Sequence, residues 1–168
     1  MQYILNFFLN CFASLFVVAG QRLRQRHVMQ NASRFPGIHA SVFFGPNVVL
    51  LADPESITIG SGTYINDGIL SASNKWPLHI GERCAIGYRV SIKTITHDPR
   101  NPTYDDAGVI ACIGAPITIG NRCWIGDNVF MREGITLGDD VIVGANSVVT
   151  KSFPNGTVIA GAPAKKIR

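Results

Sequence analysis

The sequence predicts an all-β solenoid of stacked coils, preceded by one apolar helix. Three observations support this class. Apolar residues recur every six positions without a break, at Ile119, Ile125, Met131, Leu137, Val143 and Val149. Four of these six are followed by glycine, at Gly120, Gly126, Gly138 and Gly144. A second series of small or apolar residues lies two positions earlier, at Ile117, Cys123, Val129, Ile135, Val141 and Ser147.

A period of six residues matches neither an α-helix, with about 3.6 residues per turn, nor a simple strand, with a period of about 2. It is typical of a repeat in which each unit forms one short strand and one corner. The apolar residue is expected to point inward. Glycine at the next position lets the backbone turn where a Cβ would crowd the neighbouring coil. Three strands then close one triangular coil, and coils stack through parallel backbone hydrogen bonds.

The first expected element is the apolar run from Tyr3 to Gly20, 18 residues long. Its polar residues recur every four positions and form one narrow stripe on a helix, at Gln2, Asn6, Asn10 and Ser14. Arg22, Arg24, Arg26 and His27 follow at once. Three interpretations stay open: a helix seated at a membrane with the arginines on the cytoplasmic side, a helix packed within its own oligomer, or a signal peptide. The missing basic segment before the run argues against the signal peptide.

Two domains follow from this pattern: residues 1–35, a helix with a polar connector from Gln25 to Phe35, and residues 36–168, the solenoid. The early coils are expected to bury Val42, Val48, Leu50, Ile57, Ile59, Ile65, Ile80, Ile86 and Ile92. A closing strand, Thr157 to Ala160, and a basic tail end the solenoid.

Two spacings of 21 residues interrupt the six-residue register, from Ile59 to Ile80 and from Ile92 to Ile113. The first predicts a small insertion between Ser71 and Pro77. The second contains the polar, proline-rich segment from His97 to Gly108, which predicts a loop extruded from one corner. Functional sites are often built on such loops.

The composition restricts the partners. The net charge is +4 and the pI about 9.0, which fits an anionic small ligand or a membrane surface. No nucleic-acid motif is found, and the basic residues do not alternate with aromatic ones. The four cysteines form no C-x-x-C pair, so we expect neither a disulfide nor a metal site. This use of cysteine fits a reducing compartment. Cys84 and Cys123 are expected to be core thiols.

The C-terminal third resembles a known family. The segments that carry the resemblance are Val143–Lys151 (VGANSVVTK) and Ala160–Arg168 (AGAPAKKIR), together with Ile119-Gly120-Asn121 and Ile113-Gly114 before them. They are similar to the hexapeptide-repeat acyltransferases, in particular the sugar and polysaccharide O-acetyltransferases, over roughly residues 36–168. The resemblance implies a left-handed parallel β-helix, acetyl-CoA as donor, a sugar or glycan acceptor, and a homotrimer with sites between subunits.

His97 is the expected catalytic residue. It stands where the strand Val90–Thr96 enters the long loop, and Thr96-His97-Asp98-Pro99 resembles the catalytic segment of the family. A sugar hydroxyl is a poor nucleophile at neutral pH, and an imidazole can accept its proton while the oxygen attacks a thioester. Asp98 either orients the imidazole or forms a turn. The sequence contains no G-x-S-x-G segment of the kind that carries a nucleophilic serine, so we expect no acyl-enzyme. The other histidines, His27, His39 and His79, are expected at the surface or in packing.

The acceptor is expected near Asn66, Asp67 and Trp124. Asn66 resembles a family asparagine that binds the acceptor, and the segment around Trp124 resembles one that lies near the catalytic histidine. An asparagine at a corner and a tryptophan in plain packing remain the alternatives. The chain departs from the related sugar acetyltransferases because Leu70-Ser71-Ala72-Ser73 stands where they carry an acidic residue. Asp67 could substitute for it.

The coenzyme is expected along the last coils. Small residues at Gly126, Gly144 and Ala145 would permit a pantetheine arm to approach the backbone, and phosphates need cations. Lys151, Lys165, Lys166 and Arg168 cluster after the last coil. By resemblance, Ala145, Thr150, Lys151 and Arg168 match coenzyme-contacting positions. A solvated basic tail is the alternative.

The leading hypothesis is therefore an acetyl-CoA-dependent O-acetyltransferase. Its acceptor would be a sugar or a cell-surface glycan intermediate, free or lipid-linked, modified at the cytoplasmic face of the inner membrane. One alternative is an acetyltransferase for a small soluble acceptor, such as a free sugar or serine. The other is a hexapeptide scaffold subunit without catalytic activity.

Overall fold

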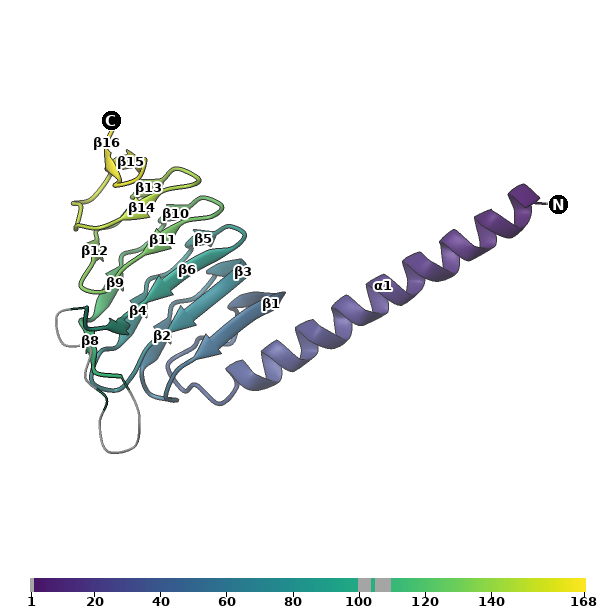
Figure 1. Cartoon of the computed structure of the whole chain (residues 1–168), viewed down its shortest axis with the longest axis horizontal. Coiled ribbons are helices and arrows are strands. Elements are labelled where there is room, and N and C mark those ends of the chain that lie inside the picture. Colours follow the sequence, from purple (N-terminus) through teal and green to yellow (C-terminus); the bar gives the residue numbers. More distant parts are fainter. Residues whose placement is uncertain (1, 100–103, 105–109) are drawn as a thin grey trace.

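The computed structural model describes residues 2–99, 104 and 110–168, and shows one helix followed by a stack of triangular coils (Figure 1). The helix is α1 (Gln2–Ala32). We name the three sides of the stack face A, face B and face C. Face A consists of β2 (Ile57–Ile59), β4 (Leu78–Ile80), β9 (Ile117–Ile119) and β12 (Thr136–Leu137).

Faces B and C meet at a corner that two long strands cross, β1 (Phe43–Leu51) and β3 (Tyr64–Ser71). Face B begins with the first halves of these strands and continues with β5 (Ala85–Ile86), β10 (Trp124–Ile125), β13 (Ile142–Val143) and β15 (Val158–Ala160). Face C begins with their second halves and continues with β6 (Val90–Lys93), β11 (Phe130–Met131) and β14 (Val148–Val149).

Parallel pairing in register puts equivalent residues of successive coils above one another. On face A, for example, Ile57 pairs with Leu78 and Leu78 with Ile117. All twelve positions of the two six-residue series between Ile117 and Val149 are at most 2% exposed. The expected inward residues of the earlier coils are buried as well. The all-β solenoid and its inward register are therefore confirmed.

The glycines that follow the six-residue series clear space at the corners but do not themselves adopt the left-handed backbone. A Cβ at Gly120 would lie 2.5 Å from Asp139 Oδ1, and one at Gly138 would lie 2.0 Å from Asn155 Oδ1. The crowding expected from the sequence is thus confirmed. The left-handed backbone falls two residues later, on non-glycine residues with φ between 55° and 59°: Arg122, Asn128, Asp140 and Asn146, with Arg83 and Arg89 in the coil before.

Side-chain bonds between coils connect these left-handed corners. Arg122 Nε donates to Asp140 Oδ1 at 2.7 Å, Arg89 Nε to Asn128 Oδ1 at 2.7 Å, and Asn128 Nδ2 to Asn146 Oδ1 at 3.0 Å. A left-handed conformation costs an L-residue about 1–2 kcal/mol. Hydrogen bonds along the corner columns offset part of that cost.

Helix α1 extends further than the sequence suggested. The segment expected to be a polar connector stays helical to Ala32, and Val28 and Ala32 are buried against the first coil with Phe35 and Phe44. The core therefore begins within the helix, not after Phe35. The N-terminal part of the helix projects away from the solenoid (Figure 1). No helix in the described part of the chain combines the length and hydropathy required to cross a membrane.

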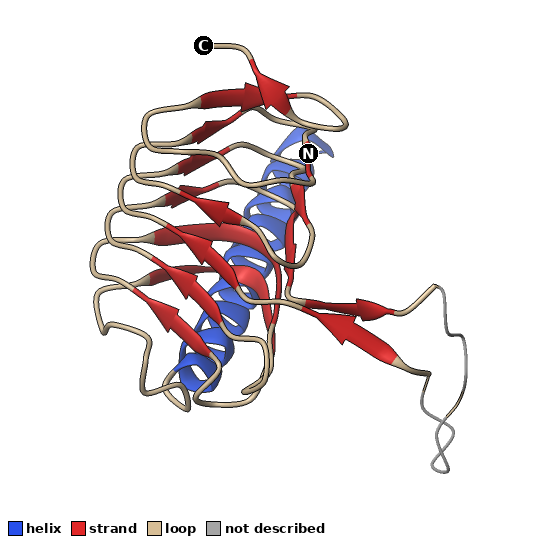
Figure 2. Ribbon diagram, turned by 90° about the vertical axis from the view of Figure 1, so that its left-hand side faces the viewer, coloured by secondary structure: helices blue, strands red, loops and turns tan. Residues whose placement is uncertain are grey.

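Both interruptions of the register are present. The first is a tight turn in which Ser73 pairs with Trp76. The second is an antiparallel arm of β7 (Ile95–His97) and β8 (Cys112–Gly114), which stands out from the coils (Figure 2). Ile113 pairs with Thr96 in this arm, so its expected place in the six-residue register is wrong. Residues 100–103 and 105–109 of the expected loop lie outside the described residues.

The remaining expectations concern the closing strand and the cysteines. The closing strand is β15, and the basic tail adds an unexpected antiparallel strand, β16 (Lys165–Lys166). Cys84 and Cys123 are at most 1% exposed, as expected for core thiols. Their sulfurs donate to the carbonyls of Gly120 and Gly138 in the next coil, both at 3.1 Å. The hydrogen bond with Cys84, followed by burial, raises the pKa of the Cys123 thiol.

Candidate active site

The arm that carries His97 is fixed firmly at its base. Thr94, which is fully buried, donates from Oγ1 to the carbonyl oxygens of Trp76 at 2.8 Å and Ser71 at 3.2 Å. The amide of Ala115 donates to Thr94 O at 3.0 Å on the other side. A Cβ at Gly114 would lie 2.5 Å from Thr94 O and 2.6 Å from the Trp76 ring. The short insertion around Trp76 and the arm, which are far apart in sequence, therefore pack against each other.

His97 is the last residue of β7 and is exposed. It pairs with Cys112 on β8, and its Nδ1 lies 3.7 Å from Cys112 Sγ. The same sulfur is 3.3 Å from Ile110 O, to which the thiol donates. The next amide, Asp98 N, donates to Ala111 O at 2.9 Å. Among these contacts, Cys112 Sγ is the one that reaches the imidazole, at Nδ1.

A cavity of about 290 Å³ lies between the arm and face C. Its lining is Leu51, Ile69, Ser71, Lys93, Ile95, Thr96, His97 and Cys112. Leu51, Ser71 and Lys93 form one row across successive coils because they are paired in register. The cavity thus combines an apolar side, a hydroxyl, an ammonium group and the imidazole.

The other expected site residues fall on different parts of the solenoid. Asn66 and Asp67 lie at the corner between faces B and C, on β3. Gly126, Gly144 and Ala145 follow the face B strands β10 and β13 and share this corner. Trp124 points outward from face B and is 59% exposed.

The remaining coenzyme candidates lie elsewhere. Thr150 and Lys151 follow β14 at the corner between faces C and A, the same edge from which the arm leaves. Lys166 is on β16, and Arg168 N and O bond to Val158 on face B. All four are exposed. The chain therefore brings His97, Thr150 and Lys151 to one edge, places Asn66, Asp67 and the small residues on another, and leaves Trp124 on face B.

Lys93 and Cys112 line the cavity and were missed from the sequence. Lys93 follows the inward Ile92, so alternation along the strand could have placed it on the outer surface beside the arm. Cys112 carried no sequence signal, because its contact with His97 depends on the antiparallel pairing of β7 and β8. The exposed Tyr64, on the same outer row of face B as Trp124, was also missed.

A second polar region lies at the corner between faces A and B. Arg122 bonds Asp140 and Asp139 there, and the bond to Asp140 raises the pKa of the guanidinium. The Arg122 bond lowers the pKa of Asp140, and the backbone N–H of Asn121 is the first cause that lowers the pKa of Asp139. Among the residues that the structure describes, no group of three or more His, Cys, Asp or Glu side chains is arranged to hold a metal ion.

Comparisons with known proteins agree with this architecture. Residues 116–151 match the family model described as the hexapeptide repeat of succinyl-transferase. The chain is 31% identical to WcaF of Escherichia coli, whose name describes it as a colanic acid biosynthesis acetyltransferase. The match covers 74% of this chain and 67% of the relative. It is 34% identical to the galactoside O-acetyltransferase of Escherichia coli, over 68% of its own length but only 54% of that relative.

Solved structures show the same fold. The hexapeptide-repeat acetyltransferase VCA0836 from Vibrio cholerae aligns with a TM-score of 0.69 and 29% identity, over 85% of this chain and 77% of that one. Its complex with acetyl coenzyme A aligns with a TM-score of 0.63 and 31% identity, over 78% and 68%. With the coil register, the extruded arm and these relatives established, the chain belongs to the hexapeptide-repeat acyltransferase family.

Proposed function

We propose that this chain is an acetyl-CoA-dependent O-acetyltransferase that modifies a hydroxyl of a sugar or glycan, with His97 as general base. The observation that carries the proposal is the presentation of His97 beside a partly polar cavity, on an arm whose base is fixed by buried hydrogen bonds. The family membership and the coenzyme bound to VCA0836 support acetyl-CoA as donor. The names of the galactoside and colanic acid relatives support a saccharide acceptor.

The contacts of His97 favour one tautomer. The Cys112 thiol directs its hydrogen to Ile110 O, so the sulfur is available as an acceptor for Nδ1–H of His97. Nε2 is then unprotonated and can accept the proton of the acceptor hydroxyl. As the hydroxyl oxygen forms its bond to the thioester carbonyl carbon, the C–S bond breaks, and Nε2 returns the proton to the departing thiolate. Acetyl-CoA thus supplies the acyl group and leaves as the free thiol of CoA.

The residues at the C-terminal end suit the coenzyme. Lys151, Lys166 and Arg168 are exposed cations that could bind its phosphates. Thr150 could donate a hydrogen bond, and the exposed, small Ala145 could border a pantetheine arm. Gly126 and Gly144 serve this corner by admitting the next coil, because a Cβ there would lie 2.7 Å from Ala145 N and 3.0 Å from Ala160 Cβ.

A homotrimer would complete the site. His97 lies on the edge between faces C and A, whereas Asn66, Asp67 and the small corner residues lie on the edge between faces B and C, and Trp124 is on face B. Faces B and C also expose apolar side chains, including Leu51, Ile69, Trp124 and Phe130. We propose that the arm of one subunit faces the acceptor edge of its neighbour, with these rows in the contact.

We place the enzyme at the cytoplasmic face of the inner membrane, attached through α1. The support is the apolar segment of the helix followed by three arginines. A chain that begins at Gln21 keeps the buried Val28 and Ala32, so it should fold. It is expected to leave the membrane fraction in which the 168-residue chain remains.

The function is tested with labelled acetyl-CoA and a panel of free sugars, serine and lipid-linked glycans, analysed by mass spectrometry. The proposal predicts a labelled acetyl ester on a saccharide. Labelled serine without a labelled saccharide would contradict the acceptor class. Binding of CoA without transfer to any member of the panel would favour a scaffold subunit.

A further inference from the structure

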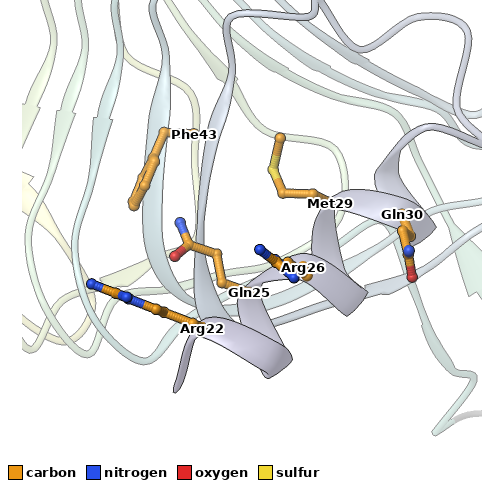
Figure 3. Close-up of a pocket in the computed structure, with 6 residues that line it drawn as sticks. All are labelled: Arg22, Gln25, Arg26, Met29, Gln30 and Phe43. Atoms are coloured by element: carbon orange, nitrogen blue, oxygen red, sulfur yellow. The ribbon is translucent and has the colours of Figure 1, made fainter. Parts of the chain in front are cut away.

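A cavity separates α1 from the outer surface of face B. It has a volume of about 440 Å³ and is lined by Arg22, Gln25, Arg26, Met29, Gln30 and Phe43. In Figure 3 the side chains of Arg22 and Arg26 extend from the helix on the side that faces Phe43. Gln25 Nε2 donates to Phe44 O at 3.2 Å and so ties the helix to β1 across this gap. The cavity is therefore built by two elements held together, and neither the proposed acetyl transfer nor its coenzyme uses it.

The net positive charge of the chain lies in the N-terminal segment that lines this cavity. Residues 1–52 contain four arginines and no Asp or Glu. The other eleven Lys and Arg residues balance the eleven Asp and Glu residues, so the net charge of +4 lies in this segment. A partner with negative charge would be drawn to this end of the molecule.

Two of these four arginines line the cavity. Arg22 and Arg26 are one helical turn apart, and like charges at this spacing repel. None of the residues that line the cavity is acidic, and within the described residues no ion pair involves Arg22 or Arg26. A bound anion would relieve the repulsion, and guanidinium groups match the oxygens of a phosphate.

Besides Gln25 and Gln30, the cavity is lined by two exposed apolar side chains. Phe43 is 49% exposed on the outer row of face B, and Met29 is 40% exposed. Val18, four residues before Arg22, continues the same helix face and is 43% exposed. A ligand that fills this site would therefore combine an anionic head with an apolar tail, which a free phosphate or a sugar phosphate lacks.

We propose that this cavity binds an anionic membrane phospholipid, with Arg22 and Arg26 on the headgroup phosphate and Met29 and Phe43 against the first methylene groups of the acyl chains. The inference rests on the membrane attachment proposed above but not on acetyl transfer. The site adds a defined headgroup contact to the attachment through the apolar segment of α1, and both are required for membrane binding.

The test is co-sedimentation of the 168-residue chain with vesicles of phosphatidylglycerol or phosphatidylcholine. The double variant R22Q/R26Q is compared with R24Q/R34Q, which removes the same charge from exposed arginines outside the cavity. Both double variants lose the same positive charge and hence the same non-specific attraction to the vesicle. The ratio of their vesicle affinities therefore measures the contribution of the cavity itself. We expect R22Q/R26Q to bind phosphatidylglycerol at least about tenfold more weakly than R24Q/R34Q, since the headgroup phosphate loses its charge-assisted hydrogen bonds. Equal losses in the two doubles would overturn the proposal.

Two further measurements separate lipid from simpler anions. Phe43→Ser should weaken vesicle binding without changing its salt dependence, whereas Val49→Ser, an equally exposed apolar residue on face C, should not. Inorganic phosphate at the same phosphate concentration should not displace the vesicles, and displacement would identify a simple anion site instead. If the unaltered chain binds neither vesicle, the membrane attachment itself is wrong. Acetyl transfer to a soluble sugar by R22Q/R26Q, measured in parallel, keeps the enzymatic proposal separate.

Discussion

Faces A and C of the solenoid share the same inward pattern but differ in what they show to the outside. The outward row of face A is polar, with Thr58, His79, Thr118 and Thr136. The outward row of face C carries Val49, Leu51, Ile69 and Phe130, each at least 36% exposed. Packing dictates the inward residues on both faces, because each must fill the same space between coils. The outward rows are free of that constraint, so function is expected where they differ.

The two faces also use histidine differently. On face A, His79 Nδ1 lies 2.7 Å from Thr58 Oγ1 in the neighbouring coil, so the ring takes part in a ladder of polar side chains. Beside face C, His97 stands on the arm and borders a cavity. The same residue type is structural in one setting and available for chemistry in the other.

The strongest test of this contrast replaces each histidine. His97→Ala should lower kcat by about 10²- to 10⁴-fold, the usual contribution of a general base, with little change in acetyl-CoA binding. His79→Ala is the control and should leave kcat within about twofold. Steady-state kinetics and calorimetric binding of CoA measure both. Near-normal turnover in His97→Ala would remove the proposed mechanism.

The inward and outward residues of one strand should differ in stability. Ile119→Ala removes a buried side chain on face A and should destabilise the chain by about 2–5 kcal/mol. Thr118→Ala, the outward neighbour, should stay within about 0.5 kcal/mol. Urea denaturation followed by circular dichroism would show the difference. Similar losses for both variants would mean that the outer row of face A is packed against something in solution.

The apolar row of face C should matter for assembly. Replacing Ile69 and Phe130 by Ser is expected to weaken the proposed trimer by about 10- to 100-fold, since buried contacts at an interface commonly contribute more than 1 kcal/mol each. The control is Thr58→Ser with Thr118→Ser on face A, which should leave the trimer intact. Analytical ultracentrifugation over a range of concentrations measures both. A fully active monomer would refute the trimer.

The cations near the last coil should act on the coenzyme alone. Lys151→Gln combined with Arg168→Gln should raise the KM for acetyl-CoA by about tenfold, because a phosphate loses charged partners. The KM for the acceptor should change by less than about twofold, and the salt dependence of coenzyme binding should weaken. Lys75→Gln, at the distant first insertion, is the control. An unchanged KM for acetyl-CoA would leave the basic tail a solvated surface.

The smallest expected effect concerns acid stability at the corner between faces A and B. The backbone N–H of Asn121 and further bonds lower the pKa of Asp139 in the folded chain. Its contribution to stability is therefore present above the pKa of the unfolded chain and is lost as the pH falls through the folded value. Asp139→Asn should lower Tm slightly at pH 7, and the difference should vanish in acid. Thr118→Ala, which removes no titratable group, should show no such trend.

The sequence predicted the interior of the solenoid well because burial repeats with the chain. Every inward position from Ile117 to Val149 could be placed from the period of six alone. The left-handed winding of the β-helix was expected only from the family resemblance, because a six-residue period is the same for either hand. The end of α1 was placed too early because Gln25 to Phe35 is mostly polar. One buried residue per turn, Val28 and then Ala32, is enough to extend the core into it.

The candidate site was predictable in part. His97 could be placed because a strand runs directly into a segment that breaks the register. The arm itself could not, because the pairing of β7 with β8 joins residues that no local pattern links. Ile113 lies six residues before Ile119 and so fitted the repeat by its spacing, although it belongs to that arm. The contact between Cys112 and His97, and that between Trp76 and Gly114, likewise depend on the folded chain.

The strand β16 has a consequence for the growth of the stack. Parallel coils present the same unpaired backbone edge after every turn, and such an edge invites another copy to continue the ladder into a fibre. β16 runs antiparallel against β15 and sets two exposed lysines on that edge. The reversal of direction breaks the parallel template, and two ammonium groups would have to lose their water if a second copy docked on that edge. A short basic strand is therefore expected to limit end-to-end growth of the β-helix.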